Sequence, residues 1–168
     1  MQSRQGFTIV ELLIVIVVIG ILAAITIVAY NGIQNRAHDT SVQSDLTTIA
    51  KKFEIFKIDA GGTYPDTAAK LAAIDNLTVS KNSYLTTGLS HNLVVCLSSD
   101  LTQYTVAAVS KSTKRYFITN TGGLQEYTGA SNWITDPNYS NMCSSTLPGS
   151  IVVSNGSGYG GVWRAWVD

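Results

Sequence analysis

The most constraining feature of this chain is an apolar run close to its N-terminus. From Leu12 to Tyr30 only Gly20 and Thr26 interrupt it. About 20 apolar residues in a helix cross the hydrocarbon core of a bilayer. Helix is also the only single-pass structure that satisfies every backbone group in lipid. The run therefore predicts one transmembrane helix.

The residues around this run bear on its orientation and its fate. Arg4 and the amino terminus precede it and Arg36 follows it, which favours a cytoplasmic N-terminus by the positive-inside rule. A removable secretory signal, with its cleavage site among the alanines of residues 23–29, is one alternative, although the run is longer than an ordinary signal core. A generic membrane anchor is another, and it leaves the charge of Glu11 unexplained.

Glu11 lies at the start of the apolar run. An ionisable side chain inside a span costs about 2.5–3.5 kcal/mol on insertion scales and marks a functional site by default. If the chain were cut after Gly6, Phe7 would carry a new α-amine one helical turn from Glu11. Cleavage at this point would give the carboxylate the nearest available cation as its partner.

Residues 6–15 read GFTIVELLIV and resemble the class III signal of type IV pilins and pseudopilins. The resemblance implies that a prepilin peptidase and N-methyltransferase cleaves the chain between Gly6 and Phe7 and methylates the Phe7 amine. It also implies that Glu11 pairs with the Phe7 amine of a neighbouring subunit and so positions each incoming copy during assembly.

The family plan divides the chain into four parts. The resemblance implies a leader at 1–6, a transmembrane and filament-core helix at 7–30, an amphipathic helix at 31–59 and a globular head at 60–168. Many family members have a proline where this chain has Val28, and that proline loosens the helix during filament packing. Two weak helix-forming sites, Gly20 and the Asn31-Gly32 pair, are candidates to replace it.

The resemblance implies a structural subunit of a type IV pilus, with no enzyme activity and no cofactor. Such a subunit is held in the cytoplasmic membrane by one span and then assembled, by a platform and an ATPase, into an extracellular filament of identical copies. A pseudopilin of a type II secretion or competence system has the same N-terminal signal, cleavage and single span, and remains an alternative. A minor pilin acting as an adhesin or DNA receptor is a third reading.

Apolar residues beyond the membrane run recur at steps of three and four. This spacing puts them on one face of a helix, which Gly61 and Gly62 end. Together the two helical halves would make one rod of about 80 Å at 1.5 Å per residue. The residues of this stripe are Val42, Leu46, Ile49, Phe53 and Phe56.

The remainder predicts an α+β head, with a connecting loop at 60–91, a sheet at 92–127 and a variable region at 128–168. A short helix follows Pro65 in the loop. Four β-branched or aromatic runs separated by turn residues predict an antiparallel meander on the helix stripe. These runs are Leu93–Leu97, Tyr104–Val109, Arg115–Thr119 and Leu124–Tyr127, and Ile151–Val153 and Val162–Val167 are further candidate strands.

Cys96 and Cys143 are the only two cysteines. Outside the cytoplasm a bridge between them would stabilise the head by about 4 kcal/mol on the chain-entropy model. Two separate buried thiols remain the alternative, because sequence does not show that the two side chains meet. The pilin resemblance implies that Cys143 anchors the C-terminal region to the sheet through Cys96.

Other signals predict little chemistry. Eleven basic and eleven acidic residues give no net charge, so no whole-chain field favours nucleic acid. His38 and His91 are isolated, and Asp136-Pro137-Asn138 has too few oxygen ligands for calcium, so neither an enzyme nor a metal site is predicted. Lys111–Arg115 is a weak candidate for DNA backbone, and an exposed Trp166 is a candidate adhesin contact.

Overall fold

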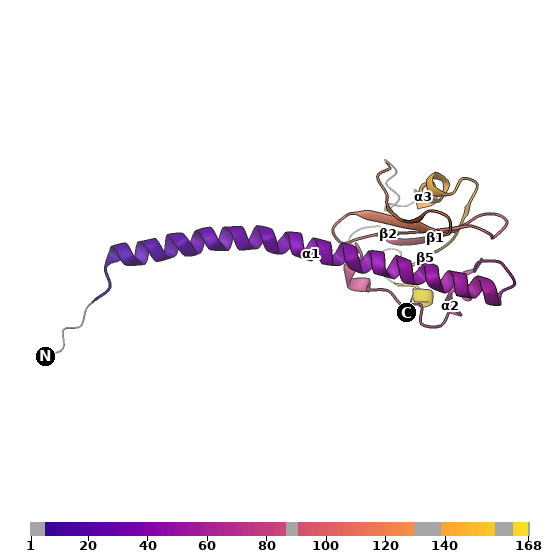
Figure 1. The fold of residues 1–168 in the computed structure, drawn as a ribbon, viewed down its shortest axis with the longest axis horizontal. Helices are drawn as coiled ribbons and strands as arrows, with labels where there is room; N and C mark the ends of the chain where they lie inside the picture. The colour runs from indigo at the N-terminus through magenta and orange to yellow at the C-terminus, as the bar shows by residue number, and fades with distance from the viewer. Residues whose placement is uncertain (1–5, 87–90, 130–138, 157–162, 168) are drawn as a thin grey trace. The chain divides into compact units, whose positions relative to one another are not determined.

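The computed structural model describes residues 6–86, 91–129, 139–156 and 163–167 (Figure 1). The chain divides into two compact units, Met1–Arg36 and Ala37–Asp168, called here the N-terminal unit and the head. Helix α1, Ile9–Asp59, has residues in both units. The two units are described separately below.

The N-terminal unit presents its apolar side chains to the surroundings. Every residue from Gly6 to Arg36 is exposed, and α1 is long and apolar enough to cross a membrane by length and composition. The hydroxyl of Thr26 donates to the carbonyl oxygen of Ala23 over 2.9 Å, so this polar group is satisfied inside the helix, as lipid requires. The helix is continuous through Val28, and a loosened stretch in a filament stays a prediction.

The part of α1 in the head is amphipathic, as predicted. Its apolar stripe is fully buried at four positions, whereas Phe56 is only half-buried. The helix ends at Asp59, where Gly61 takes a left-handed φ of +73° and the N–H of Gly62 donates to the carbonyl oxygen of Lys57 over 2.8 Å. This is a Schellman-type end, which a residue without Cβ adopts at no steric cost. The four buried residues are Val42, Leu46, Ile49 and Phe53.

Two short helical elements lie in the connecting segment. Helix α2, Ala68–Ala72, is capped by the hydroxyl of Thr67, which accepts a hydrogen bond from the N–H of Lys70 over 3.2 Å. This confirms the short helix predicted after Pro65. The 3-10 helix η1, Lys81–Ser83, follows before the sheet.

The sheet has five strands rather than the four of the predicted meander. Its order is β4-β3-β2-β1-β5, and all neighbouring strands are antiparallel. Strands β1 to β4 are neighbours in sequence order, whereas β5 pairs with the other edge of β1. Strand β5 confirms the candidate strand at 151–153. The strands are β1 (Leu93–Leu97), β2 (Tyr104–Val109), β3 (Arg115–Thr119), β4 (Gly123–Glu126) and β5 (Ile151–Asn155).

The two faces of the sheet have separate cores. Leu93, Val95 and Leu97 face the α1 stripe, and the alternate residues Val94 and Cys96 face helix α3, Tyr139–Thr146 (Figure 1). Strands β1 and β2 are therefore buried at every position. The sheet face opposite α1 is in part covered by α3, a helix that the sequence did not predict.

The candidate strand at 162–167 is wrong over its described residues, 163–167. Residues Ala165–Val167 form the 3-10 helix η3, and Trp166 and Val167 are both buried in the core on the α1 side. Two adjacent residues of a strand point to opposite faces, whereas a tight turn lets both contact one core. Burial of the pair therefore favours the turn.

Candidate assembly segment and head surface

Thr8 and Glu11 form a reciprocal cap at the start of α1. Oε2 of Glu11 accepts hydrogen bonds from the N–H of Thr8, over 2.9 Å, and from its hydroxyl, over 2.6 Å. The hydroxyl of Thr8 in turn accepts from the N–H of Glu11 over 3.3 Å. Thr-x-x-Glu in this geometry is a capping box, which satisfies backbone donors that a helix start otherwise leaves unpaired.

The capping box uses only one carboxylate oxygen. All hydrogen bonds that Glu11 accepts from the described part of the chain go to Oε2, so Oε1 is open to a further donor. Because an ionised carboxylate has acceptor capacity for several donors, the box and an external cation can be bound together. The charge of Glu11 was predicted from the sequence as a functional feature, whereas the Thr8-x-x-Glu11 capping signature was not.

The Gly6–Phe7 peptide bond lies just before the helix. Phe7 is 86% exposed, and a Cβ placed on Gly6 would meet no atom within 4 Å. Nothing in the described chain therefore shields this bond or requires glycine at position 6. A requirement for glycine at position 6 would therefore come from a partner protein that contacts the backbone there too closely to admit a side chain.

The apolar surface of the N-terminal unit is larger than a monomer in water tolerates. Its side chains are exposed on all sides of the helix, with no polar face to lie at a water interface. A helix that is apolar all round belongs in lipid or among other helices. The large members are Phe7, Ile9, Val10, Leu12–Ile19, Ile21, Leu22, Ile25, Ile27, Val28, Tyr30 and Ile33.

In the head, Cys96 of β1 and Cys143 of α3 form a disulfide, with their Cα atoms 5.5 Å apart. Met142 and Cys143 are buried against Val94 and Ala107 of the sheet. The bridge spans 47 positions of sequence and fixes α3 on the sheet face opposite α1. The structure thus has the Cys96–Cys143 bridge that the pilin resemblance implied, and not the two separate buried thiols that remained the alternative.

The basic turn is largely engaged within the head. Nζ of Lys114 lies 3.3 Å from a carboxylate oxygen of Glu126, and this bond raises the pKa of Lys114. The guanidinium of Arg115 lies 5.2 Å from the ring centre of Tyr127, and the hydroxyl of Ser112 donates to Asp39. Two of the three cations of this turn thus have partners on the head surface, which weakens the case for DNA backbone there.

Trp166 is only 3% exposed, which overturns the proposed adhesin contact. Trp163 is half-buried and packs edge-on against Tyr84, with 5.2 Å between the ring centres. His38 lies 3.5 Å from the hydroxyl of Ser83, and His91 is buried just before β1. Both histidines are thus in packed settings.

No cluster of three metal-ligating side chains occurs within the described ranges. The Asp136-Pro137-Asn138 segment, considered for calcium from the sequence, lies outside those ranges.

An apolar N-terminal helix, an antiparallel sheet and a capped glutamate at the helix start together define an α+β architecture of the type IV pilin kind. Residues 1–27 match the family model described as the prokaryotic N-terminal methylation motif. The N-terminal segment of the chain is thus of the class shared by type IV pilins and pseudopilins.

Curated relatives come from both branches of this class. Type II secretion system core protein G of Klebsiella pneumoniae is 34% identical over 74 residues, which cover 44% of this chain and 52% of that protein. The type IV wide pilus major component PilA4 of Thermus thermophilus is 39% identical over 74 residues, covering 44% and 56%. The chain therefore spans about half the length of these relatives. No solved structure matches it.

Proposed function

We propose that this chain is a structural subunit of a type IV pilus, made as a precursor and assembled into an extracellular filament. The observation that carries the proposal is the fully exposed apolar helix of the N-terminal unit with one capped carboxylate at its start. Membership of residues 1–27 in the methylation-motif family supports it. The filament would be a polymer of identical copies.

The proposed processing begins in the cytoplasmic membrane, with the N-terminus in the cytoplasm. A prepilin peptidase removes the leader, residues 1–6, and the new Phe7 amine is methylated. The exposed Gly6–Phe7 bond supports an encounter with such an enzyme. Residues 7–30 then form the membrane-held helix, and residues 31–59 and 60–168 form the rest of the subunit.

Transfer of this helix from lipid to a filament core is close to neutral in free energy per residue. The side chains leave an apolar solvent and are buried among the Leu, Ile and Val residues of other copies. Because burial gives no net drive, an assembly platform and its ATPase would supply the direction. The apolar surface of the N-terminal unit suits both environments.

Glu11 would guide each incoming copy. Its Oε1, which the capping box leaves open, would accept a hydrogen bond from the methylated Phe7 ammonium of a neighbouring subunit. Such a pair would neutralise both charges inside the apolar core, where an unpaired charge is costly. In this arrangement Thr8 holds the carboxylate in place while the neighbour neutralises it.

The second candidate is a pseudopilin, which shares the processing and the helix but makes a shorter assembly. Similarity to type II secretion system core protein G from several bacteria favours this candidate. The disulfide-held C-terminal region favours the pilus, because the C-terminal region of type IV pilins is often held in this way. A minor subunit that binds DNA is less well supported, because Lys114 and Arg115 are engaged.

Mass spectrometry of the mature protein tests the processing step. We expect a chain that starts at N-methyl-Phe7, and a Gly6→Val variant that keeps its leader. A mature start at Met1, or one beyond Ala24, would refute the proposal. Because a Cβ at residue 6 meets no atom within 4 Å in the described chain, loss of cleavage in the variant would report on the peptidase and not on the fold.

Electron microscopy with antibody against the head separates the two candidates. Cells that overproduce the protein should carry long labelled fibres if it is a pilin. If it is a pseudopilin, the same overproducing cells should carry no long labelled fibres, and disruption of the gene should block protein secretion.

A further inference from the structure

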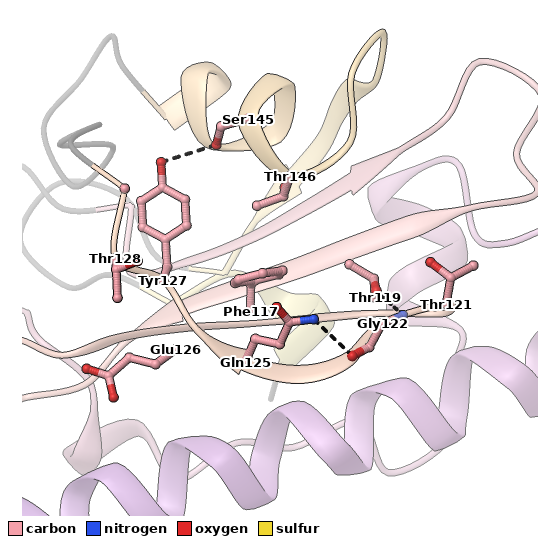
Figure 2. A pocket seen from close by; sticks show the side chains of 11 residues that line it. Phe117, Thr119, Thr121, Gly122, Gln125, Glu126, Tyr127, Thr128, Ser145 and Thr146 are labelled. Atoms are coloured by element: carbon pink, nitrogen blue, oxygen red, sulfur yellow. Dashed lines mark hydrogen bonds between the residues drawn. The ribbon is translucent and has the colours of Figure 1, made fainter.

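Helix α3 covers only part of the sheet face opposite α1. A polar groove lies beside α3, on the part of this face that α3 leaves open. It has a volume of about 510 Å³ and is formed by β3, β4, the residues after β4 and the end of α3 (Figure 2). This volume lies in the range of small-molecule sites. The disulfide holds α3 above β1, so one wall of the groove is fixed to the sheet.

Two aromatic rings make a corner in this groove. The rings of Phe117 and Tyr127 have centres 6.2 Å apart and planes at 83°. Figure 2 shows Tyr127 standing off the sheet toward Ser145, and its hydroxyl lies 3.2 Å from that of Ser145. Figure 2 also shows Phe117 close to the sheet, below Thr146. A flat ligand can therefore place its face on one ring and its edge against the other ring.

Polar groups surround this corner. Gln125 is the cross-strand partner of Phe117, and its Nε2 donates to the carbonyl oxygen of Gly122 over 3.0 Å. Its Oε1 accepts no hydrogen bond from the described residues, and Thr121 and Thr128 are exposed on the rim. The groove thus offers an amide oxygen and several hydroxyls, which can both donate and accept.

The charge of the groove limits its ligand. Neither lysine nor arginine is among the side chains that line it within the described chain, and its one carboxylate, Glu126, is paired with Lys114. The nearest arginine, Arg115, has its guanidinium 5.2 Å from the ring centre of Tyr127, so an anionic ligand would have to draw it away from that ring. A purely apolar ligand would leave the hydroxyls without partners. Neutral polyhydroxylated rings fit best, because the face of a pyranose carries C–H groups that pack on aromatic faces while its edge presents hydroxyls.

From this combination we propose that the groove between β3, β4 and α3 binds neutral pyranose sugars, with Phe117 and Tyr127 as the platform and Gln125 as the main hydrogen-bonding side chain. This binding activity goes beyond filament formation. It does not depend on whether the subunit belongs to a pilus or a pseudopilus.

The test is an NMR titration of the full chain in a zwitterionic detergent, because sugar-headgroup detergents would compete. The probes are methyl β-D-glucoside, methyl β-D-galactoside and methyl α-D-mannoside, with glycerol as a non-cyclic polyol. We expect at least one glycoside to give saturable shifts of amides in residues 115–129 and 145–146. Gln125→Ala should weaken binding by about threefold to tenfold, the worth of one hydrogen bond.

The matched control is Gln103→Ala, which removes another exposed glutamine, on the connection between β1 and β2 and outside the groove. It should bind as the parent does. Any of four results would overturn the proposal: no saturable shift with any glycoside, shifts confined to another surface, equal shifts with glycerol, or unchanged affinity in Gln125→Ala. Because Gln125 is exposed, its replacement leaves the core intact, and an unchanged melting temperature verifies this.

Discussion

The hydroxyl of Tyr84 donates a hydrogen bond of 3.0 Å to Oδ2 of Asp45 inside the head. The same carboxylate accepts from the N–H of Ser80, over 2.7 Å, and from its hydroxyl, over 3.2 Å. Asp45 is on α1, whereas Ser80 and Tyr84 flank η1, so one carboxylate joins the connecting segment to the helix. Burial raises the pKa of Asp45, and the hydrogen bonds from Ser80 and Tyr84 oppose this rise.

This raised pKa predicts a specific pH dependence of stability. Since the pKa of Asp45 in the folded head lies above its ordinary value of 3.8, its contribution to the free energy of unfolding is fully present below that value. The contribution falls as the pH rises through the folded pKa. In Asp45→Asn this dependence should be absent.

Urea unfolding of the two proteins from about pH 7 to about pH 4 measures the effect. The stability of the parent relative to Asp45→Asn should rise as the pH falls. Asp59→Asn, at the exposed end of α1, is the matched control and should follow the parent. A constant difference between the parent and Asp45→Asn across this range would contradict the prediction.

Loss of the disulfide should strongly destabilise the head. Cys143→Ala opens a loop of 47 positions, and the chain-entropy model gives about 4 kcal/mol for its closure. Chemical denaturation in the absence of reductant measures this loss. Addition of dithiothreitol should lower the stability of the parent and leave Cys143→Ala unchanged. If reductant affected both proteins equally, the bridge would not be the cause.

Two isoleucines of α1 provide a matched test of the helix stripe. Ile49 is fully buried against the sheet, whereas Ile55 is 57% exposed on the same helix. Ile49→Ala should cost about 2–5 kcal/mol through lost burial and a cavity. Ile55→Ala should change stability by only about 0.5 kcal/mol, since it removes no core contact. Equal losses in thermal unfolding would show that the stripe does not carry the core.

Glu11→Gln separates the two roles assigned to Glu11. A glutamine oxygen can still accept from the N–H of Thr8 and keep the capping box, but it brings no charge to the Phe7 ammonium of a neighbour. We expect correct cleavage and a filament yield lowered by about tenfold or more, because an unpaired buried charge costs several kcal/mol. Sheared-filament yield by immunoblot measures this.

The companion variant Thr8→Ala removes the cap and keeps the carboxylate. It should lose about 1 kcal/mol of helix-start stability and still assemble. Normal filament yield in Glu11→Gln would show that charge pairing does not guide assembly.

Local patterns were sufficient for much of the fold. The stripe at steps of three and four, the Gly61-Gly62 stop and the β-branched runs each lie within one element, so their periods are legible in sequence. The charge of Glu11 in an apolar run could be recognised for the same reason, because it lies within one short stretch of sequence. The Thr8-x-x-Glu11 cap lies within the same stretch and could also have been predicted, but was not.

Features that depend on contacts between residues far apart in sequence could not be predicted from local patterns. The sequence indicated a candidate strand at 151–153, but not that β5 pairs with β1 across more than 50 positions. Helix α3 has little apolar periodicity of its own, and η3 forms because Trp166 and Val167 share one core. The groove is lined by side chains from two strands and a helix, so no single stretch of sequence predicts it.

The sequence by itself determined the helix of the N-terminal unit, because an apolar run that only Gly20 and Thr26 interrupt needs no partner from the rest of the chain to form a helix in lipid. Only the tertiary structure decided that Cys96 and Cys143 meet, that β5 pairs with β1, and that the groove forms beside α3. The physical reason is that these features depend on contacts between residues far apart in sequence, and such contacts exist only once the sheet has formed.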